Sequence, residues 1–205
     1  MSSERAYEGS DAFIDLELDN GDLFRFRRLV PADRAAFADG IKSLSGRSRY
    51  LRFFSGFSEA PEPLLDALSN IDGKRHLAWG ALDLSKQNAP PVAAVHAIAE
   101  PELEGSVEIA CTVLDDYHHR GIARILLLLL TLDCLAAGYE HISVLVLREN
   151  KDALKLFTAL GAEYAGSEVG GPMRLEADAL VFLEKLSAMR TPHALQTILQ
   201  KNKAS

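Results

Sequence analysis

Residues 108–124, EIACTVLDDYHHRGIAR, combine the end of a strand, a tight turn and the start of a long helix. The turn places small residues, Gly121 and Ala123, where a backbone must come close to a ligand. The first amides of a helix have no partner within it and lie at the positive end of its dipole, so they form a ready site for phosphate. Glu108 lies upstream on the strand. The stretch therefore predicts chemistry on a phosphate-bearing cofactor.

The segments beside this stretch predict a mixed sheet. The helix, expected over residues 121–137, ends at Gly138, and residues 141–147 alternate like a buried strand. Such a strand–helix–strand unit requires a right-handed crossover between parallel strands. Upstream, Asn20-Gly21 predicts a hairpin turn. The expected fold class is α/β or α+β, with one parallel crossover at its centre.

The remaining elements are expected from periodicity, capping residues and turn residues. Strands are expected at residues 12–18, 23–28, 76–83, 92–98, 107–114, 162–167 and 174–183, and helices at 31–41, 46–53, 61–71, 151–160 and 184–202, the last restarting after Pro192.

Length and composition fit one globular domain. The chain has 205 residues, 48% of them hydrophobic and 25% charged. The net charge of −7 argues against nonspecific nucleic-acid binding, which needs a clustered basic face. The most apolar run, residues 125–137, is too short to span a bilayer. The N-terminus lacks the apolar segment of a signal peptide, and Cys111 and Cys134 show no metal-ligand spacing. We therefore expect a cytoplasmic protein without a metal ion.

Four motifs, in order along the chain, resemble the GNAT superfamily of acyl-CoA-dependent N-acyltransferases. Residues 118–123, HHRGIA, resemble motif A, which the family writes as Gln or Arg, two free positions, Gly, one free position, then Gly or Ala. Residues 150–162, NKDALKLFTALGA, look like motif B, and residues 28–33, RLVPAD, look like the entry into the family's first helix. Residues 44–54, LSGRSRYLRFF, are similar to a segment of bacterial protein-lysine acetyltransferases in this superfamily.

The resemblance implies a mostly antiparallel central sheet with one splayed parallel pair of strands and flanking helices. It covers residues 23–185, where we expect the acetyltransferase domain. Residues 1–22 are then an N-terminal extension with the first strand, and residues 186–205 a C-terminal helix.

The resemblance also implies a binding site for acetyl-CoA, the acyl donor. The arm of the cofactor would lie between the splayed strands and pair with the backbone of the first strand. Its pyrophosphate would rest on amides at the helix start, and Asn150 would bond the arm from the other side. The expected cofactor-binding residues are Thr112, Val113, Leu114, His118, His119, Arg120, Gly121, Ile122, Ala123, Arg124 and Asn150.

Glu108 is the expected general base, because it lies where the superfamily's protein acetyltransferases place their glutamate. A lysine ammonium has a pKa of roughly 10.4, so little of it is neutral at pH 7. A positioned base contributes roughly 10²- to 10⁴-fold to the rate. A backbone N–H near Thr112 would stabilise the oxyanion. The acyl group would pass directly from thioester to amine.

Two positions depart from the family pattern. His118 replaces Gln or Arg, at a position that acts mostly through its backbone N–H, so cofactor binding need not be lost. Phe157 replaces the tyrosine that often protonates the leaving thiolate, and phenylalanine has no proton to donate.

Several residues also have purely structural interpretations. Glu108 would otherwise be a solvent-facing strand residue, and Cys111 is better interpreted as buried and inert than as an acyl carrier. The adjacent pair His118-His119 diverges and is expected to line the cofactor, not a metal. Trp79 lines either the acceptor pocket or the core. A solvated surface is favoured for three arginines over contact with an acidic substrate or a CoA phosphate: Arg47, Arg49 and Arg52.

Three functions stay open. The leading hypothesis is acetyl transfer to a primary amine, and residues 44–54 favour a protein lysine as the acceptor. The second is a non-catalytic acyl-CoA sensor, motivated by Phe157. The third is a small-molecule acetyltransferase for a polyamine or an antibiotic. The net charge of −7 would attract a cationic acceptor and does not choose between a lysine-rich protein and a polyamine. We expect no nucleic-acid or membrane partner. The five leucines at 126–130 need cover on the outer side of their helix, from the C-terminal helix or from a second subunit of a homodimer.

Overall fold

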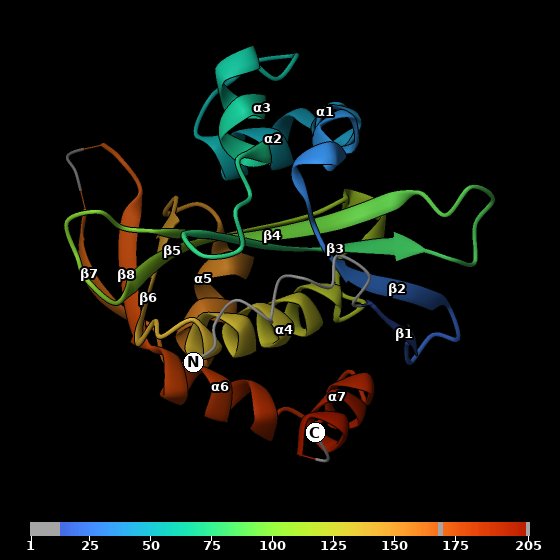
Figure 1. Cartoon of the computed structure of the whole chain (residues 1–205). Coiled ribbons are helices and arrows are strands. Elements are labelled where there is room, and N and C mark those ends of the chain that lie inside the picture. Colours follow the sequence, from blue (N-terminus) through green and yellow to red (C-terminus); the bar gives the residue numbers. More distant parts are fainter. Residues whose placement is uncertain (1–12, 168–169, 204–205) are drawn as a thin grey trace.

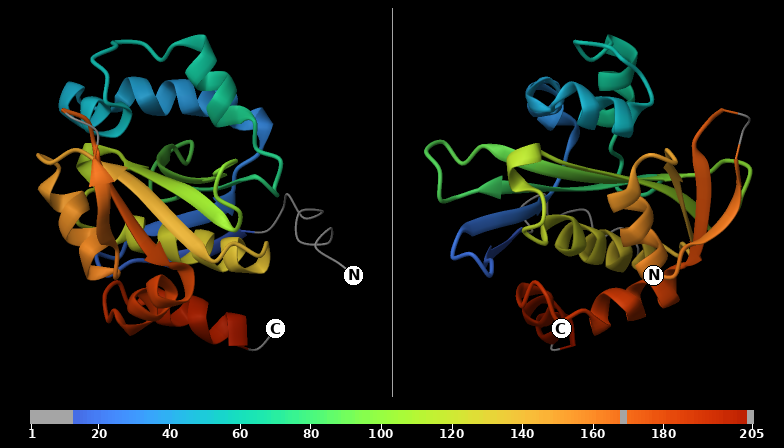
Figure 2. Two further views of the ribbon diagram at one scale, coloured as in Figure 1. Left: turned by 90° about the vertical axis from the view of Figure 1, so that its left-hand side faces the viewer. Right: turned by 180° about the vertical axis from the view of Figure 1, so that it is seen from behind.

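An eight-stranded sheet forms the centre of the protein and separates its helices into two layers (Figures 1 and 2). The computed structural model describes residues 13–167 and 170–203. Its strands are β1 (Phe13–Glu17), β2 (Leu23–Arg28), β3 (His76–Asp83), β4 (Pro91–Ala99), β5 (Ser106–Val113), β6 (His141–Val146), β7 (Glu163–Ser167) and β8 (Met173–Asp178). Its α-helices are α1 (Arg34–Ser43), α2 (Gly46–Phe53), α3 (Glu62–Ser69), α4 (Ile122–Ala136), α5 (Lys151–Ala159), α6 (Ala179–Ala188) and α7 (Ala194–Lys203).

The order of the strands confirms the expected architecture. They lie in the order β1-β2-β3-β4-β5-β6-β8-β7, and β5–β6 is the one parallel pair in the described part of the chain. The two parallel strands are joined through α4, as the predicted crossover requires. The N-terminal strand β1 pairs with β2 at one end of the same sheet.

Different helices cover the two faces of the sheet. Figure 1 shows α1, α2 and α3 on one face, and α4 on the other face with α6 and α7 outside it. Strand alternation assigns side chains to these faces: Leu77, Trp79 and Ala81 belong to the core around α4, whereas Ala78 packs with Phe37 beneath α1. Trp79 is therefore a core residue on the α4 side.

The leucine run of α4 explains why this helix is central. Leu126, Leu127, Leu128 and Leu130 are 0% exposed and Leu129 is 8% exposed, because α4 packs against the sheet on one side and against α6 and α7 on the other. The C-terminal helices thus supply the cover that the sequence predicted. In the described ranges, no helix combines the length and the apolar character needed to cross a membrane.

A polar cluster fixes α4 to the sheet. The carboxylate of Asp133 on α4 accepts two hydrogen bonds from Arg28, at 2.8 and 2.7 Å, and one from the indole N–H of Trp79, at 2.8 Å. The side chains of Arg28 and Asp133 are each 16% exposed. Removing one member of a buried charged pair is costly because its partners lose their acceptor while remaining out of water.

We therefore expect Asp133→Ala to lower the free energy of unfolding by about 3 kcal/mol, measured by chemical denaturation. The matched control is Asp66→Ala. Asp66 pairs with Arg34 on the surface and is 71% exposed, so its loss should cost less than about 1 kcal/mol. Equal losses in the two variants would contradict a structural role for the Asp133 cluster.

Two boundaries near the C-terminus differ from expectation. The predicted strand 174–183 is wrong beyond residue 178, because Asp178 ends β8 and caps α6 by accepting the amides of Leu180 and Val181 at 2.9 and 3.0 Å. The predicted helix 184–202 begins earlier than expected, at Ala179 of α6, and restarts after Pro192 as predicted, as α7 from Ala194.

Candidate active site

The parallel strands β5 and β6 pair over a short distance and then separate. Their register covers Ser106–Glu108 against His141–Ser143. Beyond that point β5 continues beside β4 to Val113, and β6 continues beside β8 to Val146. This geometry leaves a gap whose walls carry unpaired strand backbone.

Backbone alternation decides which groups of β5 face the gap. The amide of Leu114 donates to the carbonyl of Val92, at 2.9 Å, so Leu114 is bonded towards β4. Thr112, two residues earlier, faces the same way, whereas Cys111 and Val113 turn their backbone towards the gap. The ring of His118 lies beside this opening, since its Nε2 donates to the carbonyl of Val113 at 2.9 Å.

The turn into α4 presents free amides. His119 and Gly121 adopt positive φ angles, 62° and 84°. The amide of Arg124 donates to the carbonyl of Gly121 at 3.0 Å. The amides of residues 119–123 have no hydrogen-bond acceptor among the described residues. Free amides at the N-terminus of a fifteen-residue helix match the requirements of a phosphate site.

The two arginines of the turn are held by neighbouring segments. Arg120 donates to the carboxylate of Asp22, at 2.7 Å, and Arg124 donates to the carbonyl of Thr191, at 2.9 Å. A polar cavity of about 290 Å³ lies here, lined by Asp19, Asn20, His119, Arg120, Gly121, Arg124, Thr191 and Pro192. The arginines thus border a cavity at the free amides.

Asn150 follows β6, the strand on the other side of the gap from β5, and caps α5. Its side-chain oxygen accepts the amide of Ala153 at 3.2 Å. Its Nδ2 has no partner among the described residues. The residue can therefore keep its helix cap and still donate a hydrogen bond towards the gap.

Glu108 lies at the point where β5 and β6 separate. Its side chain is half-buried and has no hydrogen-bond partner in the described part of the chain. Burial raises the pKa of Glu108, the carboxylate of Glu100 adds to the rise, and Arg52 and Arg174 oppose it. A carboxylate with a raised pKa beside a gap is suited to accept protons near neutral pH.

Arg52 reaches this region from α2. The hydroxyls of Ser45 and Ser48 donate to Asp115 at 2.9 and 2.7 Å, which ties the start of α2 to the segment after β5. From there Arg52 donates from Nε to the hydroxyl of Thr112 at 3.0 Å. Burial lowers the pKa of Arg52, and the nearby Cys111 and Glu108 oppose that change. The solvated surface expected for Arg52 is therefore wrong.

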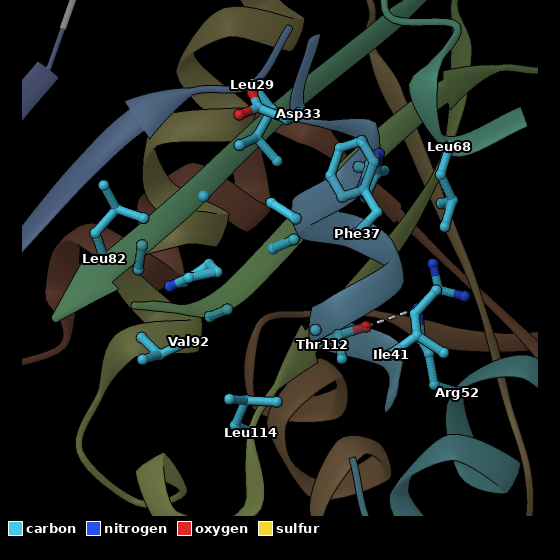
Figure 3. Close-up of a pocket in the computed structure, with 18 of the residues that line it drawn as sticks. Leu29, Asp33, Phe37, Ile41, Arg52, Leu68, Leu82, Val92, Thr112 and Leu114 are labelled. Atoms are coloured by element: carbon cyan, nitrogen blue, oxygen red, sulfur yellow. Dashed lines mark hydrogen bonds between the residues drawn. The ribbon is translucent and has the colours of Figure 1, made fainter. Parts of the chain in front are cut away.

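A second cavity, mostly apolar and of about 140 Å³, lies between α1 and the sheet (Figure 3). Phe37 and Ile41 of α1, Leu68 of α3 and Val92 of β4 line it, and Arg52 and Thr112 meet at one side through their hydrogen bond. His96 of β4 also lines the cavity.

The comparison with known families agrees with this geometry. The model of the family described as "Acetyltransferase (GNAT) family" matches residues 47–162, more than half of the chain. The chain belongs to the GNAT acetyltransferase family.

Individual relatives support the assignment. The chain is 28% identical over 161 residues to Acetyltransferase Pat of Mycolicibacterium smegmatis, which covers 77% of this chain and 46% of that protein. It thus spans less than half of that relative's length. The GNAT domain of S. lividans PAT has a TM-score of 0.71 at 22% identity, over 81% of this chain and 96% of the domain. Spermidine N-acetyltransferase from Vibrio cholerae, solved with CoA and spermine, has a TM-score of 0.61 at 17% identity, over 78% of this chain and 98% of that chain. At these identities the two structures show the GNAT fold.

The two departures from the GNAT pattern have different structural surroundings. His118 stays at the gap, where its ring contacts the Val113 carbonyl. Phe157 is 4% exposed and stacks on Phe182, with ring centroids 6.2 Å apart, so it is part of the core between α5 and α6. Cys111 also behaves as a packing residue, since burial raises the pKa of its thiol to about 12.

Two histidines beside the GNAT site were not among the predicted site residues. His76 and His96 are 5% and 4% exposed and lie on β3 and β4. The sequence did show one histidine in each of two otherwise apolar strands, which could have marked them as site candidates. Whether the two histidines touch depends on the register between β3 and β4, which the sequence does not show.

Proposed function

We propose that this protein transfers an acetyl group from acetyl-CoA to a primary amine by direct attack. The observation that carries the proposal is the coincidence of three features at one place: the gap between β5 and β6, the free amides of residues 119–123, and Glu108 where the strands part. Membership of the GNAT acetyltransferase family supports it.

In this proposal each wall of the gap holds part of acetyl-CoA. The pyrophosphate binds the free amides at the start of α4, with Arg120 and Arg124 beside it. The arm pairs with the backbone of Val113 and with the Nδ2 of Asn150. A β5 amide turned to the gap, at Cys111 or Val113, donates to the thioester oxygen, an interaction worth about 3 kcal/mol in the transition state.

Glu108 takes a proton from the acceptor, which arrives as an ammonium ion. The neutral nitrogen then attacks the thioester carbon. The nitrogen of the tetrahedral intermediate gives up a second proton, the C–S bond breaks, and the sulfur leaves with the electron pair of that bond. The raised pKa of Glu108 suits this role, because a base with a pKa closer to that of the working solution transfers protons more effectively.

The proposed acceptor is a lysine side chain on a protein. The similarity to Acetyltransferase Pat supports this choice, as does the position of α2 (Gly46–Phe53), which lies within the predicted lysine-acetyltransferase-like segment and brings Arg52 to the site. A polyamine is the second candidate, favoured by the shared fold with a spermidine N-acetyltransferase. Both cysteines are free, which supports a reducing compartment such as the cytoplasm. A homodimer and the domain limits at residues 23 and 185 stay predictions.

The test has two stages. Calorimetric titration with acetyl-CoA should show micromolar binding. A thiol-release assay with a lysine-containing peptide and with spermidine should then show turnover with the peptide in preference. No binding of acetyl-CoA would reject the proposed function, whereas faster turnover with spermidine would reject the protein acceptor and keep the chemistry.

A further inference from the structure

Two buried histidines form a hydrogen-bonded pair beneath α1. Nε2 of His76 lies 2.9 Å from Nδ1 of His96, and Nδ1 of His76 lies 3.1 Å from the carbonyl oxygen of Asn70. The ring of His96 also packs on Phe37, with centroids 5.4 Å apart. Nε2 of His96 is left without a hydrogen-bond partner among the described residues.

The contacts define where each proton lies. A carbonyl oxygen can only accept, so Nδ1 of His76 carries a proton. Burial lowers the pKa of His76, and burial, His76 and Arg52 lower the pKa of His96 well below 6.5, so both rings are neutral at pH 7. Nε2 of a neutral His76 must then accept, and Nδ1 of His96 must donate. The remaining nitrogen, Nε2 of His96, is a bare lone pair.

The register places His96 on the strand next to β5, on the sheet face that also carries Glu108 and Thr112. His96 stands opposite Ala110 on β5, and Glu108 and Thr112 lie two residues to either side of Ala110 on the same face. Ala110 is thus the direct neighbour of His96 across the β4–β5 pair, and Glu108 and Thr112 are its diagonal neighbours. Diagonal neighbours lie within the reach of long side chains. Ala94, two residues before His96 on the same face of β4, lines the adjoining cavity together with His96 and Thr112.

The chemistry of amine acylation requires two protons to leave the nitrogen. An ammonium ion carries three N–H bonds in addition to its carbon substituent, and the amide product of a primary amine keeps one. Glu108 accounts for the first proton. After attack, the nitrogen is again positively charged and must lose a second.

We propose that Nε2 of His96 takes this second proton, and that His76 is a positioning residue that keeps the lone pair available. The inference rests on the proposed function. The N–C bond forms with the lone pair of the amine, the N–H bond breaks towards Nε2, and collapse of the tetrahedral intermediate breaks the C–S bond. The imidazolium then gives its proton to the thiolate sulfur, a role that Phe157 cannot fill.

The charged groups around His96 define its pH response. His76 faces it from β3, Arg52 from α2 and Glu108 from β5. The residues of α1 that line the cavity carry no charge, and Arg27 and Asp33, also on its wall, are paired with each other at 2.9 Å. His96 and Glu108 must both be unprotonated, so log kcat should fall by about two per pH unit at the acid end.

The kinetic experiment uses His96→Gln with acetyl-CoA and N-α-acetyl-lysinamide. We expect kcat to fall by about 100-fold, the acid limb to lose one of its two proton steps, and the Kd of acetyl-CoA to stay within about twofold. His141→Gln, which changes an exposed histidine at the start of β6, is the matched control and should leave all three unchanged. A His96→Gln enzyme with unchanged kcat and an unchanged acid limb would overturn the proposal.

A measurement on the unaltered protein covers the case in which the variant fails to fold. Nitrogen-15 spectra of the labelled histidines should show His96 with a protonated Nδ1 and a bare Nε2 at pH 7. A protonated Nε2 would overturn the proposal. If the wild type neither binds acetyl-CoA nor turns over, the proposed function is rejected. The tautomer measurement is separate from that result, because it tests only whether Nε2 of His96 is unprotonated.

Discussion

Glu108→Gln is expected to lower kcat by about 10²- to 10⁴-fold and to leave the Kd of acetyl-CoA within about twofold of the wild type. Glutamine keeps the size of the side chain and removes its capacity to accept a proton. The proposed phosphate site at the start of α4 is formed by different residues, so binding should persist. Calorimetry with acetyl-CoA and a thiol-release assay measure the two quantities separately.

The pKa of Glu108 predicts how the reaction rate changes with pH. Burial, helped by Glu100, raises the pKa of Glu108 above its usual 4.5, and the base works only when it is unprotonated. The wild-type rate should therefore fall as the pH drops through this raised pKa, and Glu108→Gln should lose that step. Glu104→Gln, which alters an exposed glutamate just before β5, is the control. Unchanged turnover in Glu108→Gln would remove Glu108 from the mechanism.

Gly121→Glu is expected to weaken acetyl-CoA binding by at least about 100-fold. The substitution puts a negative charge among the amides that would hold the pyrophosphate. It also strains the backbone, because Gly121 has a φ of +84° and a Cβ there would lie 2.6 Å from Cδ of Pro192. Calorimetric titration with acetyl-CoA measures the loss, and circular dichroism confirms the fold.

Two alanine variants separate strain from charge. Gly121→Ala adds the Cβ without the carboxylate. Gly138→Ala imposes a similar strain, at a φ of +88°, in open space at the other end of α4. A left-handed residue costs about 1–2 kcal/mol in each case. We expect wild-type acetyl-CoA binding in Gly138→Ala and a smaller loss in Gly121→Ala than in Gly121→Glu. Binding by Gly121→Glu equal to the wild type would place the phosphate elsewhere.

Much of the fold could be predicted because its signals are local. The hairpin at Asn20-Gly21, the glycine-terminated α4 and the motif around residues 118–123 each lie within a short window. The resemblance supplied the mostly antiparallel sheet with one parallel pair, and the strand order came only with the structure. The segment after Arg174 was misassigned because its apolar residues, partly alternating, read as a strand. The decisive interaction, Asp178 capping α6, competes with that pattern and wins.

The site was only partly predictable for a physical reason. Residues near one another in sequence, such as Glu108 and Gly121, can be placed by their motif. Arg52 was assigned to the surface because helical spacing cannot show that α2 docks on Asp115 and delivers its guanidinium to Thr112. The pairing of His76 with His96 joins residues twenty positions apart and exists only through the β3–β4 register.

The short pairing of β5 with β6 makes the sheet two assemblies joined by a narrow seam. Three residue pairs and the crossover through α4 hold the halves together where the proposed substrate binds. A molecule that contacts β5 on one side of this seam and β6 on the other holds the two halves together, and it binds only when both halves are folded. By mass action, acetyl-CoA at 100 times its Kd would add about 2.7 kcal/mol to the stability of the whole chain. In a cell rich in acetyl-CoA, the proposed complex would then be more resistant to unfolding than the protein without it.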